Sequence, residues 1–435
     1  MEEAETLQLF NAPTPAWLRN TFDAFRHADI KMLNHGLGVD STGLTHMILD
    51  EPERFGVAPD FSDFVVVTAI LGDEFEDTNQ DTEKHLYGRL RSLGVRTVQV
   101  SRRGPERGDG IAILSDTRSP TRVERRGPYT LRDELLLNGT IPTAAGGHRC
   151  SMNHKAWTLD TLARQAFPGA RVGKLIGYNA DEARRATKSE KNNKGAFAMD
   201  YPLIRENFDR TRITRYVTER TGVAWGKSYC SFCPFSGVCA SRPAHLARLR
   251  KYPHVAAQDL LLEYRAMALN PRSKLYVTET LYKRVSDDQQ VQALGEFEAL
   301  LEQSEWAVYH VRRAYGAARR ESCQRGGHPK DCKRTACHDA SAKGAVDRSV
   351  ETVATGSRQL ALQRLKALAA ERGRPLEHDM AHPVGLERVI LRYRPDKVYG
   401  TVEEFYVLAP AGIKDKEKER FPGTWDRIAE QGLIA

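Results

Sequence analysis

Apolar residues in the first part of the chain form short runs that alternate with helical patterns. Four runs predict strands, at residues 29–34, 64–70, 95–100 and 172–178. The run Phe64–Ile70 is continuous, which is typical of a strand buried on both faces of a parallel sheet. Helical patterns lie between and around these runs, at residues 14–28, 42–49, 79–93 and 156–167. This alternation predicts an α/β fold, a doubly wound parallel sheet with helices on both faces.

The rest of the chain predicts a change of character near residue 270. Residues 101–126 and the polar segment 188–194 resemble loops, whereas residues 129–138, the segment that begins at Asp181, 209–220 and 243–270 suggest helices. Beyond residue 270, helices are predicted at 288–301, 307–320 and 351–372, and short strands at 389–393 and 405–408. We therefore expect a nucleotide-binding domain over residues 1–270 and a mainly helical domain over residues 271–435.

Composition narrows the possible classes of protein. The chain has 435 residues, 40% of them hydrophobic and 28% charged, which is typical of globular proteins with two domains. It contains no apolar run of about 18 residues, and the acidic start Met1–Glu5 does not resemble a signal peptide, so we expect a cytoplasmic protein without a membrane partner. The net charge of +8 is compatible with DNA or RNA as a partner, although a general bias toward arginine would give the same value.

The segment His35–Leu44 carries the first chemical signal. Gly36 and Gly38 lie between a predicted strand and a predicted helix, where glycine permits positive φ and lets phosphate oxygens approach the backbone. Free backbone N–H groups and the helix dipole favour an anion at such a position. A plain glycine turn before an ordinary helix is the alternative interpretation.

This segment resembles the PP-loop, Ser-Gly-Gly-x-Asp-Ser, of the N-type ATP pyrophosphatases and the phosphoadenosine phosphosulfate (PAPS) reductases, although Leu37 stands in place of a glycine. The resemblance implies an adenine nucleotide, ATP or PAPS, as cofactor and Asp40 and Ser41 as catalytic residues. The residues that it implies for nucleotide binding here are Gly36, Leu37, Gly38, Val39, Asp40, Ser41 and Thr42.

Two later segments extend the resemblance. Gly72–Thr78 follows the buried strand with carboxylates, where Asp73 and Glu74 could hold Mg²⁺ against phosphates, or form an ordinary solvated loop. It resembles the family's Thr-Gly-x-Glu-x-Pro-Glu-Thr stretch, which implies catalytic roles for Asp73 and Glu74. Ile176–Arg185 resembles the family's Gly-Ile-Arg-Ala-Asp-Glu-Ser-x-x-Arg segment. This match implies that the nucleotide is also bound by Gly177, Asp181, Arg184 and Arg185.

Cysteines form two candidate metal sites. Cys230 and Cys233 have the CxxC spacing that chelates one metal or cluster, and Cys239 supplies a third thiolate. Cys150 lies in a segment that resembles the family's Arg-x-Cys-Thr-x-x-x-Lys element. Members such as the DNA-phosphorothioation sulfurtransferase imply a 4Fe–4S cluster on these four cysteines, while Zn²⁺ and unligated thiols stay open. The second set, which suits a structural zinc ion or an incidental basic loop, is Cys323, His328, Cys332 and Cys337.

The resemblance covers roughly residues 25–250 and implies an enzyme. The first expectation is a PP-loop protein that uses ATP and a cysteine-ligated cluster to transfer sulfur, with nucleic acid as a compatible acceptor and a cysteine desulfurase as a possible donor. The second is a sulfonucleotide (PAPS or APS) reductase, although the chain ends Glu430–Ala435 without the family's Glu-Cys-Gly-Leu-His segment. The third is a nucleotide-binding or nucleic-acid-binding accessory protein of a mobile-element or defence system, CRISPR-associated or phage, without turnover.

Overall fold

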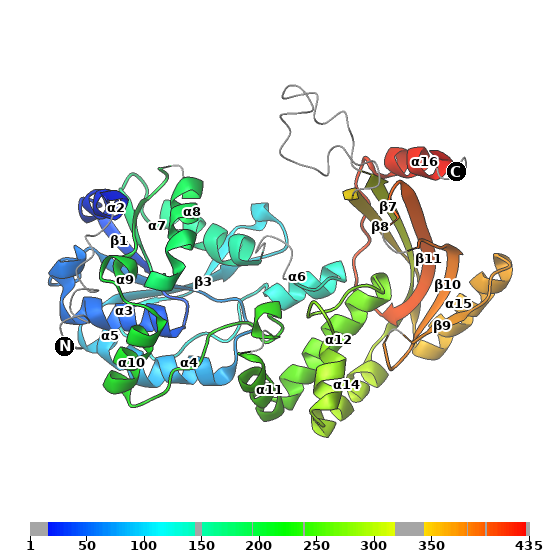
Figure 1. Cartoon of the computed structure of the whole chain (residues 1–435), viewed down its shortest axis with the longest axis horizontal. Helices are drawn as coiled ribbons and strands as arrows, with labels where there is room; N and C mark the ends of the chain where they lie inside the picture. The colour runs from blue at the N-terminus through cyan, green and yellow to red at the C-terminus, as the bar shows by residue number, and fades with distance from the viewer. Residues whose placement is uncertain are drawn as a thin grey trace, which may run out of the picture. The chain divides into compact units, whose positions relative to one another are not determined.

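The computed structural model divides the chain into two compact units. The first comprises residues 1–134 and 144–236, and the second residues 135–143 and 237–435 (Figure 1). The structure describes residues 16–143, 150–193, 195–237, 240–317, 343–380, 382–395 and 398–431. The first unit therefore ends at Ser236, whereas the sequence suggested a boundary near residue 270.

The first unit is an α/β domain with a six-stranded sheet of order β4-β3-β2-β1-β5-β6. All neighbouring strands pair in parallel except β3 and β4, an arrangement compatible with a Rossmann-like fold. The strands are β1 (Ile30–Asn34), β2 (Phe64–Ala69), β3 (Arg96–Arg102), β4 (Ile111–Thr117), β5 (Val172–Ile176) and β6 (Ala198–Asp200). The α/β prediction is thus confirmed.

Successive strand residues point to opposite sides of this sheet, so both of its faces are apolar, and helices cover both. Leu33 and Val66 belong to one apolar cluster, whereas their neighbours Met32 and Val65 belong to another. The first cluster includes residues of α3 and α5, and the second includes residues of α7. The helices of this unit are α2 (Ala16–Arg26), α3 (Val39–Asp50), α4 (Glu76–Thr82), α5 (Gly88–Ser92), α7 (Trp157–Ala166), α8 (Ala183–Asn193), α9 (Pro202–Arg205) and α10 (Arg210–Thr221); α6 (Leu131–Asn138) continues into the second unit.

Two loop predictions in this unit are wrong. Residues 111–117 form β4, which pairs antiparallel with β3 although Arg, Gly and Pro surround it. Residues 188–193 continue helix α8, because the buried Ala186 anchors a helix whose other positions are mostly polar. The predicted N-cap Thr14 and the first helical residue Pro15 lie outside the described residues.

The second unit contains a five-stranded antiparallel sheet of order β8-β7-β11-β10-β9, so the prediction of a mainly helical region is wrong. Residues 307–320 were expected to form a helix, yet 306–317 form β7; residues 351–356, expected in a helix, end β8. The strands are β7 (Trp306–Ala317), β8 (Lys343–Gly356), β9 (Glu377–Asp379), β10 (Leu386–Arg392) and β11 (Thr401–Pro410). The helices are α11 (Arg242–Lys251), α12 (Pro253–Leu269), α13 (Leu281–Asp287), α14 (Val291–Gln303), α15 (Arg358–Glu371) and α16 (Phe421–Gln431).

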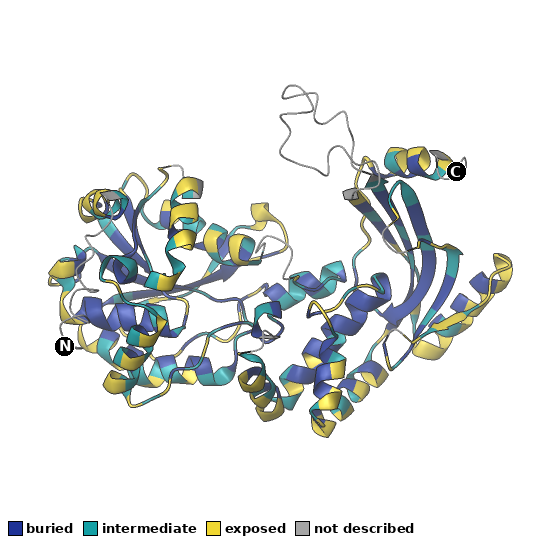
Figure 2. Cartoon of the chain, in the orientation of Figure 1, coloured by how far each residue is buried: buried dark blue, intermediate teal, exposed yellow. Residues whose placement is uncertain are grey.

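Burial on both faces explains the error at β7. Its residues from Trp306 to Tyr309 are all buried, as Figure 2 shows for the central strands, so the polar–apolar alternation of a half-exposed strand is absent. Arg372, just after α15, donates to Tyr406 on one face of β11, while Arg388 of β10 donates to the carbonyl groups at the end of α12. No helix among the described residues is both long enough and apolar enough to cross a membrane.

Candidate nucleotide site and cysteine cluster

The loop after β1 has the conformation that a glycine-rich phosphate loop needs, but at an unexpected residue. Leu37 adopts positive φ (58°), whereas Gly38 is extended at φ −93°. Our expectation that Gly36 and Gly38 would supply the positive φ is therefore wrong. The Leu37 side chain is 3% exposed and packs in the core cluster that includes α3, so it does not fill the loop's outer side. Leucine here keeps a backbone geometry that glycine would favour, and such strain is typical of functional loops.

The segment before the CxxC motif fixes the direction of the loop's peptide groups. Trp225 Nε1 donates to the Leu37 carbonyl oxygen at 3.1 Å, and Ser228 Oγ donates to the Gly36 carbonyl oxygen at 2.8 Å. In a trans peptide the N–H points opposite to the C=O, so the N–H groups of Leu37 and Gly38 point away from this segment. With the unpaired N–H groups at the start of α3, they form a set of donors suited to an anion.

Hydroxyl groups of α3 brace the loop from within. Ser41 Oγ accepts from the Gly36 N–H and donates to the Gly38 carbonyl oxygen, both at 3.1 Å. Thr42 Oγ1 lies 3.3 Å from Nε2 of His35, whose pKa burial lowers to about 3, with a further contribution from His46. His35 is therefore neutral at physiological pH, and Ser41 and Thr42 shape the loop through these local contacts.

Asp40 is held at the first turn of α3. Its carboxylate lies 2.7 Å from Arg210 Nη1 and accepts from Asn179 Nδ2 at 3.3 Å. Burial raises the pKa of Asp40, an effect that Arg210 and the Asn179 hydrogen bond oppose. The carboxylate thus couples the phosphate loop to the loop after β5 and to the start of α10.

The loop after β5 approaches the start of α3 very closely. A Cβ atom at Gly177 would lie 3.2 Å from the Cα of Ser41, so glycine permits this contact. Arg185 stacks over the Tyr178 ring at 4.5 Å and pairs with Glu182. The Asp181 carboxylate accepts from the backbone N–H of Arg210, 3.1 Å away.

These two loops border a cavity of about 680 Å³ at the carboxyl edge of the sheet. The strand order reverses between β1 and β5, and open α/β sheets bind ligands at such a position. Of the residues expected at the nucleotide, the cavity is lined by Gly36–Ser41, Gly177 and Arg185. The structure therefore brings most of the expected residues together. Thr42 is buried beneath the loop, Asp181 lies beside it, and Arg184 is exposed on α8 away from the lining.

The two acidic residues after β2 have different environments. Asp73 is buried and accepts from the backbone N–H and Nε of Arg132, both at 3.0 Å. Glu74 instead lines the cavity, and its Oε1 lies 3.8 Å from Lys155 Nζ. Of this pair, Glu74 is the carboxylate that faces the cavity and could hold a metal ion.

Strand-like pairing brings the CxxC segment to the same edge. Cys230 forms an isolated antiparallel bridge with Glu74, and the Ser231 N–H donates to the Asp73 carbonyl oxygen at 2.9 Å. Burial raises the pKa of Cys230 well above its usual value, and the nearby charge of Glu74 adds to this effect. Burial likewise raises the pKa of Cys233.

Lys155 is a cation that lines the cavity and whose pKa the charges of three cysteines influence. It is the last but one residue of a π-helical segment, Ser151–Ala156, that begins directly after Cys150. Burial alone would lower its pKa, but the charges of Glu74, Cys230, Cys150 and Cys233 raise it overall. The charges of the three described thiols thus act on one ammonium group that lines the cavity.

The metal predictions are tested only in part by this geometry. Within the described parts of the chain, no group of three His, Cys, Asp or Glu side chains is placed to hold a metal ion. Cys239 lies outside those parts, as do all four residues of the second set, Cys323, His328, Cys332 and Cys337.

Sequence patterns did not reveal several residues of the site. Arg210, Trp225 and Ser228 contact Asp40 or the loop, yet each lies in a segment without a recognisable spacing. Asn179, which donates to Asp40, lies within the matched segment Ile176–Arg185 but was not singled out. Lys155 entered the sequence analysis only as the final lysine of the segment around Cys150 that resembles Arg-x-Cys-Thr-x-x-x-Lys. Their roles depend on tertiary contacts, so one sequence carries no signal for them.

No family model, curated protein or solved structure matches this chain in the three comparisons with known proteins. The fold and site geometry therefore carry the functional inference.

Proposed function

We propose that the first unit binds an adenine nucleotide, ATP or PAPS, with its phosphates at the loop after β1. The observation that carries this proposal is the convergence of that loop and the Gly177 loop on the start of α3, at the rim of the 680 Å³ cavity. The volume falls within the range of about 300–1,000 Å³ that is usual for small-molecule sites. The adenine base itself is inferred from the resemblance to PP-loop proteins.

The chemistry follows from which groups face the cavity. Backbone N–H groups of Leu37, Gly38 and the first turn of α3 would hold the phosphates, and Glu74 would hold Mg²⁺ against them. An oxygen of the acceptor would then attack the α-phosphorus, and pyrophosphate would leave. The outer sulfur of a donor such as a cysteine desulfurase persulfide would displace AMP from the activated acceptor. A second thiol would then attack the donor sulfur of the resulting disulfide, which releases the thiolated acceptor and leaves a disulfide between that thiol and the donor.

The cysteines suit a sulfur-related role because the charges of three thiols act on Lys155, which lines this cavity. Cys150, Cys230 and Cys233, with Cys239, are a donor set suited to a 4Fe–4S cluster or Zn²⁺. Such a group would stabilise these cysteines as thiolates and could present sulfur at the cavity. Lys155 would balance the negative charge of the thiolates.

The same thiols favour a second candidate, a sulfonucleotide reductase. A thiolate would attack the sulfur of the sulfonucleotide, and the nucleoside phosphate would leave. A second thiol would release sulfite and close a disulfide. Sulfite release from PAPS or APS would support this reaction, pyrophosphate release from ATP would support the first, and nucleotide binding without either would support an accessory protein.

The phosphate loop is tested with Gly36→Val. A Cβ at Gly36 meets nothing within 4 Å, so the variant should fold normally while its side chain occupies the loop's open side. Loss of two phosphate hydrogen bonds should weaken binding of Mg·ATP or PAPS about 100-fold by calorimetry. Gly108→Val is the matched control, because Gly108 is exposed and its Cβ would also meet nothing within 4 Å. Equal affinity in both variants would refute the placement of the phosphates.

The cysteine proposal is tested by anaerobic purification and metal analysis. Stoichiometric iron with a brown colour supports the cluster, and stoichiometric zinc supports the alternative. Cys233→Ser should lose the metal in either case. A metal-free wild-type protein with accessible thiols would contradict both, without touching the nucleotide proposal.

A further inference from the structure

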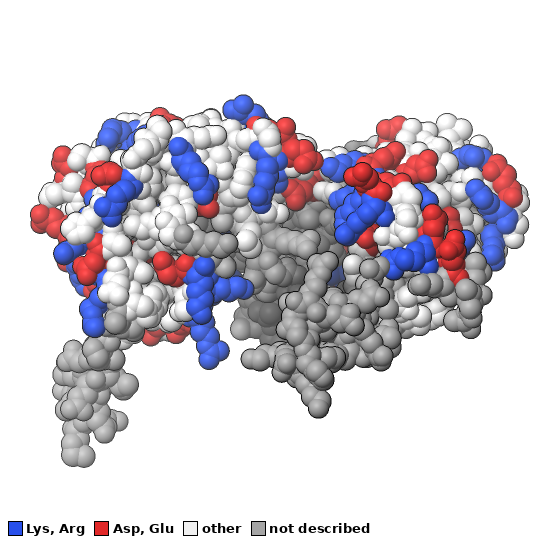
Figure 3. Space-filling model, turned by 90° about the horizontal axis from the view of Figure 1, so that it is seen from above, with Lys and Arg blue, Asp and Glu red and all other residues white. Residues whose placement is uncertain are grey.

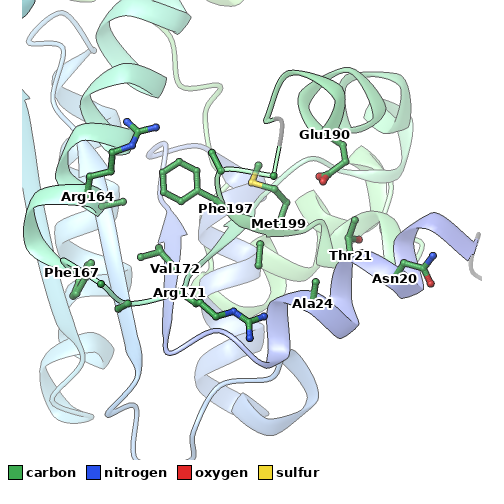
Figure 4. Close-up of a pocket in the computed structure, with 16 residues that line it drawn as sticks. Asn20, Thr21, Ala24, Arg164, Phe167, Arg171, Val172, Glu190, Phe197 and Met199 are labelled. Carbon is green, nitrogen blue, oxygen red and sulfur yellow. The ribbon is translucent and has the colours of Figure 1, made fainter.

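A second cavity of about 660 Å³ lies in the first unit, between α2, α7 and β6 (Figure 4). Phe197 and Met199 lie in the middle of the view, with Arg164 on the α7 side and Thr21 and Ala24 on the α2 side. Phe197 and Met199 also line the first cavity, so they form a shared wall. This second cavity has no role in the nucleotide chemistry proposed above.

Its lining suits a flat aromatic ring. Phe167, Val172, Phe197 and Met199 provide large apolar surfaces, and most other wall positions are alanine or glycine, which leave room. The Phe197 ring is fixed by cations: Lys174 Nζ lies 3.5 Å from its centroid and Arg164 Cζ lies 5.3 Å from it. A firmly held ring beside an open apolar space is a platform on which a nucleobase can stack.

The charged groups at the rim favour an anion outside the ring pocket. Arg164 and Arg171 are exposed, and neither guanidinium forms an ion pair with a carboxylate among the described residues. The one acidic residue of the lining, Glu190, accepts from the Tyr201 hydroxyl at 3.2 Å. The carbonyl groups at the end of α7 lie nearby and could accept from the amino groups of a base.

Helix α8 carries a separate exposed basic face, which is turned away from its lining residue Glu190. Arg184, Lys188 and Lys191 recur at intervals of four and three residues, so they share one face, and all three are exposed. On the face that Figure 3 presents, Lys and Arg side chains stand between Asp and Glu side chains. A local cluster, rather than a broad positive field, must therefore supply the attraction.

We propose that this surface binds single-stranded nucleic acid, with one base in the second cavity and phosphates at Arg164 and Arg171. A base inside a duplex cannot enter such a pocket unless it leaves the stack, so single strands are favoured. The binding does not depend on nucleotide binding in the first cavity. Only its interpretation as the sulfur acceptor rests on the proposed function.

Two kinds of variant separate the phosphate contacts from the base pocket. Binding of a labelled 12-nucleotide single strand is measured by fluorescence anisotropy at several salt concentrations. The double variant Arg164→Gln/Arg171→Gln should bind about 10-fold more weakly, and its salt slope should fall by about 1.4, since each single-strand phosphate contributes about 0.7. Ala24→Trp, at an exposed position of the cavity wall, should weaken binding about 10-fold by excluding the base, with the salt slope unchanged.

Controls use equivalent residues elsewhere. Arg118→Gln/Arg122→Gln removes two exposed arginines beyond β4 at the opposite edge of the sheet, and Ala367→Trp places tryptophan at an exposed site of α15. Both should bind the strand like the wild type, and all variants should keep their affinity for ATP. Equal binding of duplex and single strand, or loss of affinity in the controls to the same degree, would overturn the proposal. So would wild-type affinity in Ala24→Trp.

Discussion

Charged residues lie at different places in the sheets of the two units. In the first unit, Asp40, Glu74 and Lys155 lie beyond the ends of the strands and border a cavity. In the second unit, Arg313 and Glu403 face each other in the middle of paired strands β7 and β11. Both sets include buried groups, but only the first set leaves space next to its polar atoms.

This difference separates binding sites from structural networks. Arg313 Nη1 donates to Glu403 at 3.0 Å and to Asn270 at 3.1 Å, and the Tyr315 hydroxyl also donates to Glu403. Glu263 likewise accepts three backbone N–H groups, from Leu275, Leu281 and Tyr282. Such groups already have partners, so their burial indicates stability rather than a ligand.

The largest expected effect comes from breaking the network in the second unit. Arg313→Ala leaves the buried Glu403 carboxylate with only the more distant Arg272, 3.8 Å away, and should destabilise this unit by about 3 kcal/mol. Hydrogen exchange should rise in β7 and β11 but not in the first unit. The matching variant in the first unit is Arg210→Ala, which removes the half-exposed ion-pair partner of Asp40. It should lower the free energy of unfolding by under about 1 kcal/mol but should change the affinity for ATP. If a folded Arg313→Ala variant bound ATP more weakly than the wild type, the distinction between a binding site in the first unit and a structural network in the second would be wrong.

The next effect concerns acid stability in the second unit. His382 is fully buried against Tyr264 and Tyr282, and burial lowers its pKa to about 4. The unfolded chain binds a proton near pH 6.5, so this stability is complete above pH 6.5 and is lost as the pH falls toward 4. The loss amounts to about 3 kcal/mol.

His382→Phe keeps an aromatic ring and should remove this contribution to the pH dependence. Unfolding free energy, measured by denaturant titration between pH 4 and 7.5, should fall less steeply than in the wild type. His254→Phe, at an exposed position of α12, is the control and should retain the wild-type slope. Parallel pH curves for His382→Phe and the wild type would show that another group titrates.

The contrast between local patterns in the first unit and long-range partners in the second explains which elements could be predicted from the sequence. Four strands of the first unit, β1, β2, β3 and β5, were predicted because Phe64–Ala69 and its neighbours form short apolar runs bounded by polar turns; the edge strands β4 and β6 were not. The glycine loop was found because its local residue types suffice to mark it. In β7, the segment Val311–Tyr315 contains two arginines, and Arg313 is buried only because Glu403 lies opposite on a strand 90 residues later. That partnership leaves no local pattern, so a helix was predicted.

A smaller effect is expected where the two loops of the first cavity touch. In Gly177→Ala the new Cβ lies 3.2–3.3 Å from the Ser41 backbone, so the start of α3 must shift by a few tenths of an ångström. We expect ATP affinity to fall about 10-fold, because donors to phosphate tolerate little displacement. Gly295→Ala in α14 meets nothing within 4 Å and should be neutral or stabilising by up to about 1 kcal/mol. Wild-type ATP affinity in Gly177→Ala would argue against a ligand at this contact.

The smallest effect comes from two tryptophans that make the same hydrogen bond in different units. Trp225 Nε1 donates to the Leu37 carbonyl oxygen and Trp306 Nε1 to the Leu301 carbonyl oxygen, each at 3.1 Å. Replacing either residue with phenylalanine should cost about 1 kcal/mol of stability, because a buried carbonyl loses its donor. The Leu37 carbonyl and the Gly38 N–H belong to the same peptide group, so losing the Trp225 hydrogen bond lets that N–H change direction. Trp225→Phe alone should therefore lower the affinity for ATP, by about threefold. Calorimetry on both variants decides this, since equal ATP affinities would mean that the hydrogen bond to Leu37 stabilises the fold without orienting the phosphate loop.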